Sequence, residues 1–283
     1  MMAGTASCRH HHSFFYVQTL RFRGNEIMKI FVCIKHVPDT AANIKLVGDN
    51  GFEDSECKFI VNPYDEYGLE EAVSLVEKEG GEVVVVTVGK GAATATLRSA
   101  MAMGALRAIH VQTQGQFLDS SLTAKALKAA MDQDGAADLI FTGKGSVDTE
   151  GSQTQYRLAA SMGLPVVNEV SRLTIDGGKA TMEKEVGGGE REVLEMTLPG
   201  IIGATKGLNE PRYPKFPDIM KAKKKKIQEI AIADLGIDEN AGPSQLVKLE
   251  AVPERSGAKM LEGSVQEQVT QLLKVLREDE KII

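Results

Sequence analysis

From residue 28 onward, short runs of β-branched residues alternate with longer stretches whose apolar residues recur at helical spacing. The consecutive valines 83–86 are typical of a strand that is buried on both faces. Such alternation indicates βαβ units, and therefore predicts an α/β domain built on a mostly parallel sheet. Strands are predicted at 29–37, 82–89, 107–112 and 137–143, and helices at 64–79, 92–103 and 118–133.

A different pattern begins after about residue 164. A hairpin is predicted over 173–186, with its tight turn at Asp176-Gly177-Gly178. Further strands are expected at 191–197 and 198–204, and the compact domain is expected to end near Pro214.

The chain after Pro214 is expected to form an arm that carries one helix, at 264–278, with an apolar stripe along one face. A segment of about 65 residues with a single helix has too little apolar material for a core of its own. It must therefore lie on another surface, such as that of a partner subunit. The expected division is 1–27 as an extension, 28–214 as the α/β domain and 215–283 as the docking segment and arm.

The composition excludes several classes of protein. With 42% hydrophobic and 25% charged residues the chain is typical of a globular protein, and a net charge of −6 argues against a nucleic-acid binder. Three cysteines without CxxC spacing predict neither a disulfide framework nor a metal site, and they favour a reducing compartment. Because no apolar run approaches about 18 residues, direct membrane insertion is not expected.

Residues 1–27 contain several arginines and histidines but a single acidic residue, Glu26. Three interpretations remain open: a misassigned start with Met28 as the true beginning, a disordered extension, or an organelle presequence. The expected compartment is accordingly the cytoplasm, or the mitochondrial matrix if the chain is eukaryotic and the extension is a presequence.

Common catalytic motifs are absent from the sequence. It has no GxSxG, no HExxH, no Walker loop and no GxGxxG after a strand. Past the extension, the histidines are His36 and His110, each in or at the end of a predicted strand, where a lone histidine is usually structural.

One glycine-rich loop, 142–154, has the character of a binding site. It follows a predicted buried strand and leads into a helix, where free amides favour a phosphate. The alternative is an ordinary strand-to-helix turn capped by Asp148, and composition alone does not separate the two. The stretch 61–65 is similarly open, since Asn-Pro commonly begins a helix.

A second unusual stretch, 208–226, combines three closely spaced prolines, apolar residues that stand among charged ones and a run of lysines. Lysine runs are usually solvated surfaces or polyanion sites. Prolines stiffen a loop and reduce the entropy cost of docking it, and an exposed aromatic residue offers an anchor. This stretch is therefore predicted to be a rigid docking loop.

The segment LNEPRYPKFPDIMKAKKKKI (208–227) closely resembles the signature of electron-transfer flavoprotein β subunits. The likeness extends over nearly all of 28–283, in the family's order and spacing, and leaves out 1–27. It includes VCIKHVPD (32–39), VNPYDEYGLEEAV (61–73), RSAMAMGALRAIHV (98–111) and GKGSVDTEGSQT (143–154).

The resemblance implies a three-layer fold like that of the adenine-nucleotide α-hydrolases and universal stress proteins, with an arm that wraps an α subunit. It implies an electron carrier, not an enzyme, whose FAD lies mainly on that α subunit. Dehydrogenases such as acyl-CoA dehydrogenases would donate electrons, and a quinone oxidoreductase or another acceptor would receive them. The β subunit holds structural AMP, or in bifurcating members a second FAD that oxidises NADH. A free-standing module like a universal stress protein is the further alternative.

Carried over by motif, the resemblance implies a nucleotide pocket in this chain. Its residues would be Cys33 (through its backbone), Asn62, Pro63, Tyr64, Asp65, Val88, Gly143, Lys144, Gly145, Ser146, Val147, Asp148, Thr149, Glu150, Gly151, Ser152, Gln153 and Thr154. Thr154 matches the AMP branch, whereas bifurcating members tend to have valine there. Gln155 departs from the family, which usually has glycine, and Gly151 and Ser152 replace bulkier residues.

The resemblance also implies a surface that docks donor dehydrogenases. Its residues would be Tyr213, Phe216, Pro217, Ile219, Met220 and Lys221. The family's anchor is usually a leucine, and Phe216 stands in its place. The larger ring is suited to a different dehydrogenase pocket.

Overall fold

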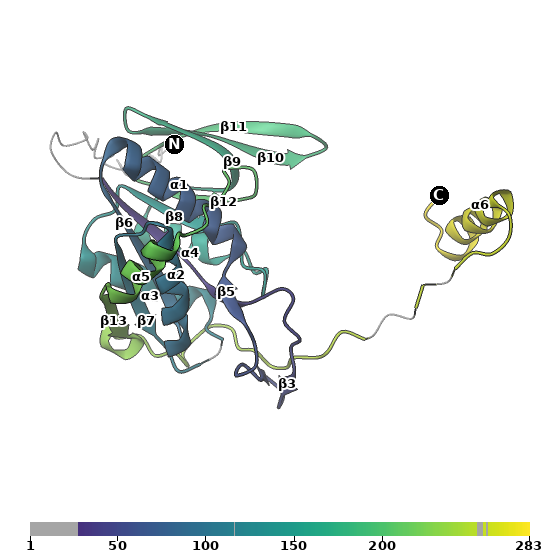
Figure 1. Ribbon diagram of the computed structural model, residues 1–283, viewed down its shortest axis with the longest axis horizontal. Helices are drawn as coiled ribbons and strands as arrows, with labels where there is room; N and C mark the ends of the chain where they lie inside the picture. The colour runs from purple at the N-terminus through teal and green to yellow at the C-terminus, as the bar shows by residue number, and fades with distance from the viewer. Residues whose placement is uncertain (1–27, 116, 254–256, 259) are drawn as a thin grey trace, which may run out of the picture. The chain divides into compact units, whose positions relative to one another are not determined.

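A computed structural model describes residues 28–115, 117–253, 257–258 and 260–283 (Figure 1). Residues 1–27, for which three interpretations were open, lie outside the described residues. The chain divides into two compact units, of which the larger ends at Val247 and the smaller is Lys248–Ile283. In the described part of the chain no helix is both long and apolar enough to span a membrane.

Among the described residues, nine strands of the larger unit form one sheet in the order β11-β10-β9-β12-β8-β1-β6-β7-β13. From β12 to β13 all neighbours are parallel, while β9, β10 and β11 form an antiparallel extension. The strands are β1 (Lys29–Cys33), β6 (Glu82–Gly89), β7 (Arg107–Gln112), β8 (Leu139–Gly143), β9 (Val166–Asp176), β10 (Lys179–Gly187), β11 (Glu190–Thr197), β12 (Ile201–Ala204) and β13 (Ile227–Ala231).

Helices cover both faces of the sheet (Figure 1). Successive strand residues point to opposite faces, so Ile30 and Val32 join one core while Phe31 and Cys33 join the other. The first core takes residues from α1 (Pro63–Glu79), α2 (Thr94–Met103) and α5 (Phe216–Lys224), and the second from α3 (Ser120–Asp134) and α4 (Thr154–Met162). The predicted three-layer α/β fold is confirmed.

Short elements complete the described chain. Two small antiparallel pairs lie between β1 and α1, and the smaller unit consists mainly of one helix. The elements are β2 (His36–Pro38), β3 (Leu46–Val47), β4 (Gly51–Phe52), β5 (Phe59–Val61), the 3₁₀ turns Gly91–Ala93 and Ile232–Leu235, α6 (Val265–Lys274) and a π turn at Val275–Asp279.

Two expected boundaries differ in the structure. The strand expected over 29–37 leaves the sheet at Cys33, and its last residues form β2, which pairs with β5. The sheet also continues past the expected domain end at Pro214, because β13 pairs with β7 and becomes the edge strand on that side. Residues 215–247 therefore belong to the larger unit and not to an arm.

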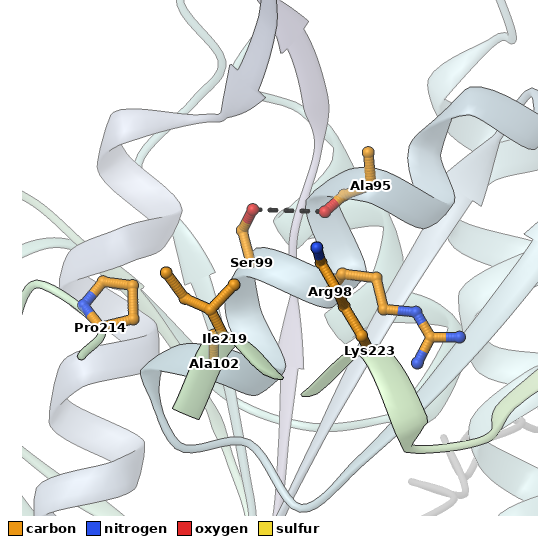
Figure 2. A pocket seen from close by; sticks show the side chains of 7 residues that line it. All are labelled: Ala95, Arg98, Ser99, Ala102, Pro214, Ile219 and Lys223. Atoms are coloured by element: carbon orange, nitrogen blue, oxygen red, sulfur yellow. Dashed lines mark hydrogen bonds between the residues drawn. The ribbon is translucent and has the colours of Figure 1, made fainter. Parts of the chain in front are cut away.

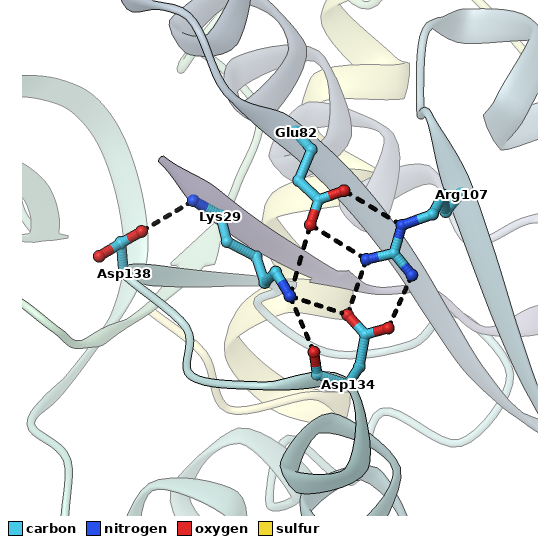
Figure 3. A network of polar contacts seen from close by, with 5 residues as sticks. All are labelled: Lys29, Glu82, Arg107, Asp134 and Asp138. Carbon is cyan, nitrogen blue, oxygen red and sulfur yellow. Dashed lines mark hydrogen bonds and ion pairs between the residues drawn. The ribbon is translucent and has the colours of Figure 1, made fainter. Parts of the chain in front are cut away.

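A charged network joins the amino ends of three neighbouring strands (Figure 3). Arg107 at the start of β7 makes bidentate contacts to Asp134 (2.6 and 2.8 Å) and to Glu82 (3.0 and 3.1 Å). Lys29 at the start of β1 pairs with the same two carboxylates, and its amide donates to Asp138 at 2.7 Å. Hydrogen bonds from Arg107 lower the pKa of Asp134. The network thus ties β1, β6 and β7 to the end of α3.

We expect the substitution Arg107→Met to lower the free energy of unfolding by about 1–2 kcal/mol, since it leaves the largely buried carboxylate of Asp134 with Lys29 alone. Urea-induced unfolding at a fixed protein concentration measures the change. Arg172→Met, which removes the same charge from an exposed position on β9, is the matched control and should shift stability by less than about 0.5 kcal/mol. Equal effects of the two substitutions would contradict the role assigned to the network.

Candidate functional site

The strand order reverses between β1 and β8, and we use the word crevice for the topological position between the connections that follow their carboxyl ends. The chain proceeds from β1 to β6 and β7 on one side, and then returns to place β8 on the other side of β1. Such a reversal leaves a gap between the connections that follow the two strands, and open α/β sheets bind ligands there. Cys33 and Gly143 are the last residues of these strands, so the glycine-rich loop begins at this crevice.

A buried carboxylate ties the elements around the crevice together. Asp65, in the first turn of α1, accepts hydrogen bonds from the amide of Lys35 (2.7 Å), the amide of Gly143 (2.9 Å) and the side chain of Asn62 (2.9 Å). The Asn62 side chain also donates to the carbonyl of Gly145 at 2.9 Å and accepts from the amide of residue 147 at 3.1 Å. We call Asn62 and Asp65 the hub.

The hub depends on close approach. A Cβ atom at Gly143 would lie 2.4 Å from Oδ1 of Asp65 and 2.7 Å from Cβ of Tyr64, so only glycine lets α1 approach the end of β8. Burial raises the pKa of Asp65 to about 7, and the three hydrogen bonds oppose that rise. Because both carboxylate oxygens accept N–H groups, the geometry matches the ionised form.

The outer part of the loop is held by Lys35. Its ammonium group contacts Asp148 (2.8 Å), Ser146 (3.3 Å) and Thr149 (3.4 Å), and the two hydroxyls lie 2.9 Å apart. Asp148 is thus engaged by an ion pair and does not cap α4, contrary to the alternative in which it caps the turn. Farther along, Glu150 and Ser152 adopt positive φ angles of 48° and 45°, which non-glycine residues rarely take.

The amino end of α4 is the part of the site best suited to an anion. Its N-cap residue, Gln153, makes no side-chain hydrogen bond to the first turn of the helix. The first amides of a helix have no partner within it, and they carry its positive dipole end. The hydroxyl groups of Ser152 and Thr154 flank these amides along the chain. A phosphate therefore fits this end of the loop.

Below the loop, Gln155 is buried and donates to the carbonyl of Lys144 at 3.0 Å. Asn168 on β9 donates to the same carbonyl at 3.1 Å. Gln155, which stands where the resembling family usually has glycine, thus supports the carbonyl of Lys144 beneath the loop. Among the described residues, the buried side-chain oxygens of Thr142 and Asn168 have no hydrogen-bond partner, which adds unsatisfied polar groups beside this end of β8.

The remaining residues of the expected pocket belong to β1, the start of α1 and β6. Pro63 occupies the first turn of α1, and the ring of Tyr64 lies 5.1 Å from the ammonium group of Lys144. Burial raises the pKa of the Cys33 thiol far above its usual range, so the thiol stays protonated. Val88, near the end of β6, is half-buried.

Sequence reasoning missed Lys35 and Asn168. Lys35 lies within the resembling segment 32–39 and so was open to inspection, but its partners are more than 100 residues away. Asn168 stands in a strand with no motif, and the sequence carries no signal of its contact with Lys144. That the assembled residues bind a nucleotide stays a prediction.

Both histidines are built into the fold. His36 bonds to the hydroxyl of Thr96 at 2.6 Å and stacks on Phe59 with centroids 4.3 Å apart. His110 is fully buried and contacts the carbonyl of Gly89 at 3.1 Å. Burial, and secondarily His110, lowers the pKa of His36 and favours its neutral form.

The second candidate surface is formed by the docking segment, residues 208–221. Phe216 begins α5, so the prediction of a rigid loop is wrong from this residue onward, where the chain is helical. Pro217 fits there because a proline in the first turn of a helix removes no helical hydrogen bond. Tyr213 and Phe216 are 95% and 74% exposed, and Met220 and Lys221 are also exposed.

The base of the docking segment is fastened to α1. Arg212 pairs with Glu70 (2.8 Å) and Glu77 (2.6 Å), and Asn209 donates to Glu71 at 2.9 Å. Farther along, Ile219 and Pro214 line a groove of about 410 Å³ between α2 and α5 (Figure 2). The segment therefore has a fixed base and presents its aromatic side chains outward.

Comparison with known proteins places the chain among relatives of one kind. The model of the electron transfer flavoprotein domain matches residues 50–235. The electron transfer flavoprotein subunit beta of Bacillus subtilis is 36% identical over 260 residues, which cover 90% of this chain and 100% of the relative. The mitochondrial subunit beta of Arabidopsis thaliana is 38% identical over 251 residues, covering 87% and 97%.

A third relative, the subunit beta of Syntrophomonas wolfei, is 41% identical over 207 residues, 73% of this chain and 81% of that protein. The matched domain includes the hub, the glycine-rich loop, the docking segment and β13. The fold, these sites and the full-length similarity agree, and the chain belongs to the electron transfer flavoprotein beta subunit family.

Proposed function

We propose that this chain is the β subunit of a heterodimeric electron-transfer flavoprotein. FAD held mainly on the α subunit accepts electrons from dehydrogenases, such as acyl-CoA dehydrogenases, and passes them to a quinone oxidoreductase or another acceptor. The chain is an electron-carrier subunit and not an enzyme, and it works in the cytoplasm or in the mitochondrial matrix. The observation that carries this proposal is the similarity to a subunit beta over that relative's whole length.

AMP is the proposed occupant of the crevice between β1 and β8. The amides at the start of α4, with Ser152 and Thr154, would hold its phosphate, and the hub would keep the loop in place. AMP would supply no redox chemistry, and the positive dipole end of α4 would stabilise the negative charge of its phosphate. A second FAD in the same crevice, as in the bifurcating branch, is the alternative, and a free-standing nucleotide-binding module is the third.

The smaller unit supports the proposal that the chain has an obligate partner. Its helix α6 begins with a capping box in which Ser264 and Glu267 bond each other's backbone amides, so the helix is well defined at its start. Along the helix, Val265, Val269 and Leu272 are exposed, and none of its residues is buried. An exposed apolar stripe of this kind marks an interaction surface, and the α subunit is the proposed cover.

The proposed surface for donor dehydrogenases is the docking segment, with Phe216 as its anchor. Ion pairs of Arg212 with α1 hold the segment's base, which lowers the entropy lost on docking. The exposed aromatic ring of Phe216 offers apolar area to a pocket on the partner. Neighbouring lysines chiefly set the charge of the surface.

Denaturing the purified heterodimer should release one FAD and one AMP, and Thr154→Val should weaken AMP binding by about 1–3 kcal/mol because a buried phosphate oxygen loses a donor. Chromatography of the released nucleotides measures both. Thr181→Val, at an exposed position of β10, is the matched control. Two FAD per wild-type heterodimer would favour the bifurcating alternative, and undiminished AMP in Thr154→Val would move the phosphate elsewhere.

Expressed alone, the chain should be poorly soluble or should exchange amide hydrogens rapidly over 248–283, because the apolar stripe of α6 lacks its cover. Co-expression with the α subunit should restore solubility and protect α6. Hydrogen exchange followed by mass spectrometry compares the two preparations. A soluble monomer with a protected α6 would instead support the free-standing module.

Phe216→Ala should raise the apparent Michaelis constant for this protein as electron acceptor by roughly tenfold, since loss of a central aromatic anchor commonly costs about 2 kcal/mol or more. Steady-state assays with an acyl-CoA dehydrogenase of the same organism measure it. FAD content and heterodimer stability should not change. The control is Val193→Ala, which shortens an exposed apolar side chain on β11. Unchanged kinetics would remove the docking role, and loss of FAD would mean that Phe216 packs inside the complex.

A further inference from the structure

The helix that begins at Phe216 is too short to be stable by itself. α5 has nine residues, and Ala222 is its one buried residue. Isolated helices shorter than about 12–15 residues are marginal in water, because nucleation costs more than a few hydrogen bonds return. The orientation of Phe216 therefore depends on contacts between α5 and the rest of the domain.

Arg98 of α2 supplies the contacts at the carboxyl end of α5. Its Nη1 donates to the carbonyl of Ala222 at 2.6 Å and also to the carbonyl of Lys225, the C-cap residue. The carbonyl of Ala222 also accepts from the amide of Lys225 at 3.2 Å, and the guanidinium adds a charged donor at the negative dipole end of the helix. A second contact holds the same turn, because the side chain of Lys225 donates to the carbonyl of Ala105 at 2.8 Å.

The element that carries Arg98 is a firm support. On one side of α2, Leu97 and Ala100 are buried in the core above the sheet. Small residues of α2, Ala95, Ser99 and Ala102, line the groove between α2 and α5, and Figure 2 shows Arg98 among them beside Lys223. The turn that Arg98 holds leads directly into β13, which pairs with β7. Arg98 thus fixes the junction between α5 and the sheet.

We propose that Arg98 is a positioning residue for the docking of donor dehydrogenases: capping α5 from α2, it holds Phe216 in the orientation that the partner's pocket accepts. This inference rests on the proposed docking role of Phe216. Arg98 lies in the groove behind α5, where it touches α5 and not the exposed ring. Its effect should therefore appear in the affinity for the donor and not in the rate once the complex has formed.

The test compares Arg98→Met, Arg98→Lys and Phe216→Ala in the heterodimer with the full-length chain. Methionine keeps much of the arginine stem but has no donor, while lysine keeps the charge without the planar guanidinium. Arg98→Met should raise the apparent Michaelis constant roughly three- to tenfold with kcat unchanged, and Arg98→Lys should have an intermediate effect. Amide exchange over 216–226 should quicken in Arg98→Met. Arg172→Met is the control for lost charge, and FAD and AMP content should match wild type throughout.

The outcomes separate this inference from the proposed function. If Phe216→Ala raises the Michaelis constant and Arg98→Met does not, the positioning role is wrong and the docking role stands. If Phe216→Ala has no effect, the docking role fails, and the positioning role fails with it even where exchange over α5 quickens. Loss of FAD, AMP or kcat in Arg98→Met would make Arg98 a general structural residue. Should Arg98→Met not fold, wild-type exchange and kinetics in Arg98→Lys would overturn the inference.

Discussion

The buried carboxylate of Asp65 is the constraint on which the arrangement of the candidate nucleotide site depends. It receives the amide after β1, the amide that ends β8 and the side chain of Asn62, and so joins two strand ends to one helix start. A buried charge is tolerated only where hydrogen bonds replace the water it has lost. Those hydrogen bonds require the glycine at 143, because any Cβ there would meet the carboxylate. The close packing at Gly143 and the hydrogen bonds to the carboxylate of Asp65 therefore depend on each other.

Helix α1 extends this constraint to the docking segment. Its first turn forms the hub, and farther along Glu70 and Glu77 hold Arg212, while Glu71 holds Asn209. The proposed nucleotide site and the base of the docking segment thus share one helix that packs on the sheet. This connection would give the proposed nucleotide a structural role, because a loosened hub would disturb the helix that holds the base of the proposed docking segment.

The two ends of the sheet are stabilised by different means. At the amino ends, partly buried ion pairs around Arg107 join strand starts. At the carboxyl ends, backbone amides converge on Asp65 and the start of α4 remains open. Exposed apolar side chains occur at both surfaces where a partner is proposed to bind, at Phe216 and along α6.

The sequence by itself determined the layers, the parallel order implied by βαβ units and the identity of the glycine-rich loop, because hydrophobic period and local turn chemistry act over a few residues. It also determined the family, through a 20-residue segment and four shorter ones. Only the tertiary structure decided where β1 stops, that α5 is a helix and that β13 joins the sheet as its edge strand beside β7. The contacts responsible span large separations: Lys35 to Asp148, Arg98 to Ala222, and β7 to β13. Such pairings are set by the packing of the whole domain, and no local pattern encodes them.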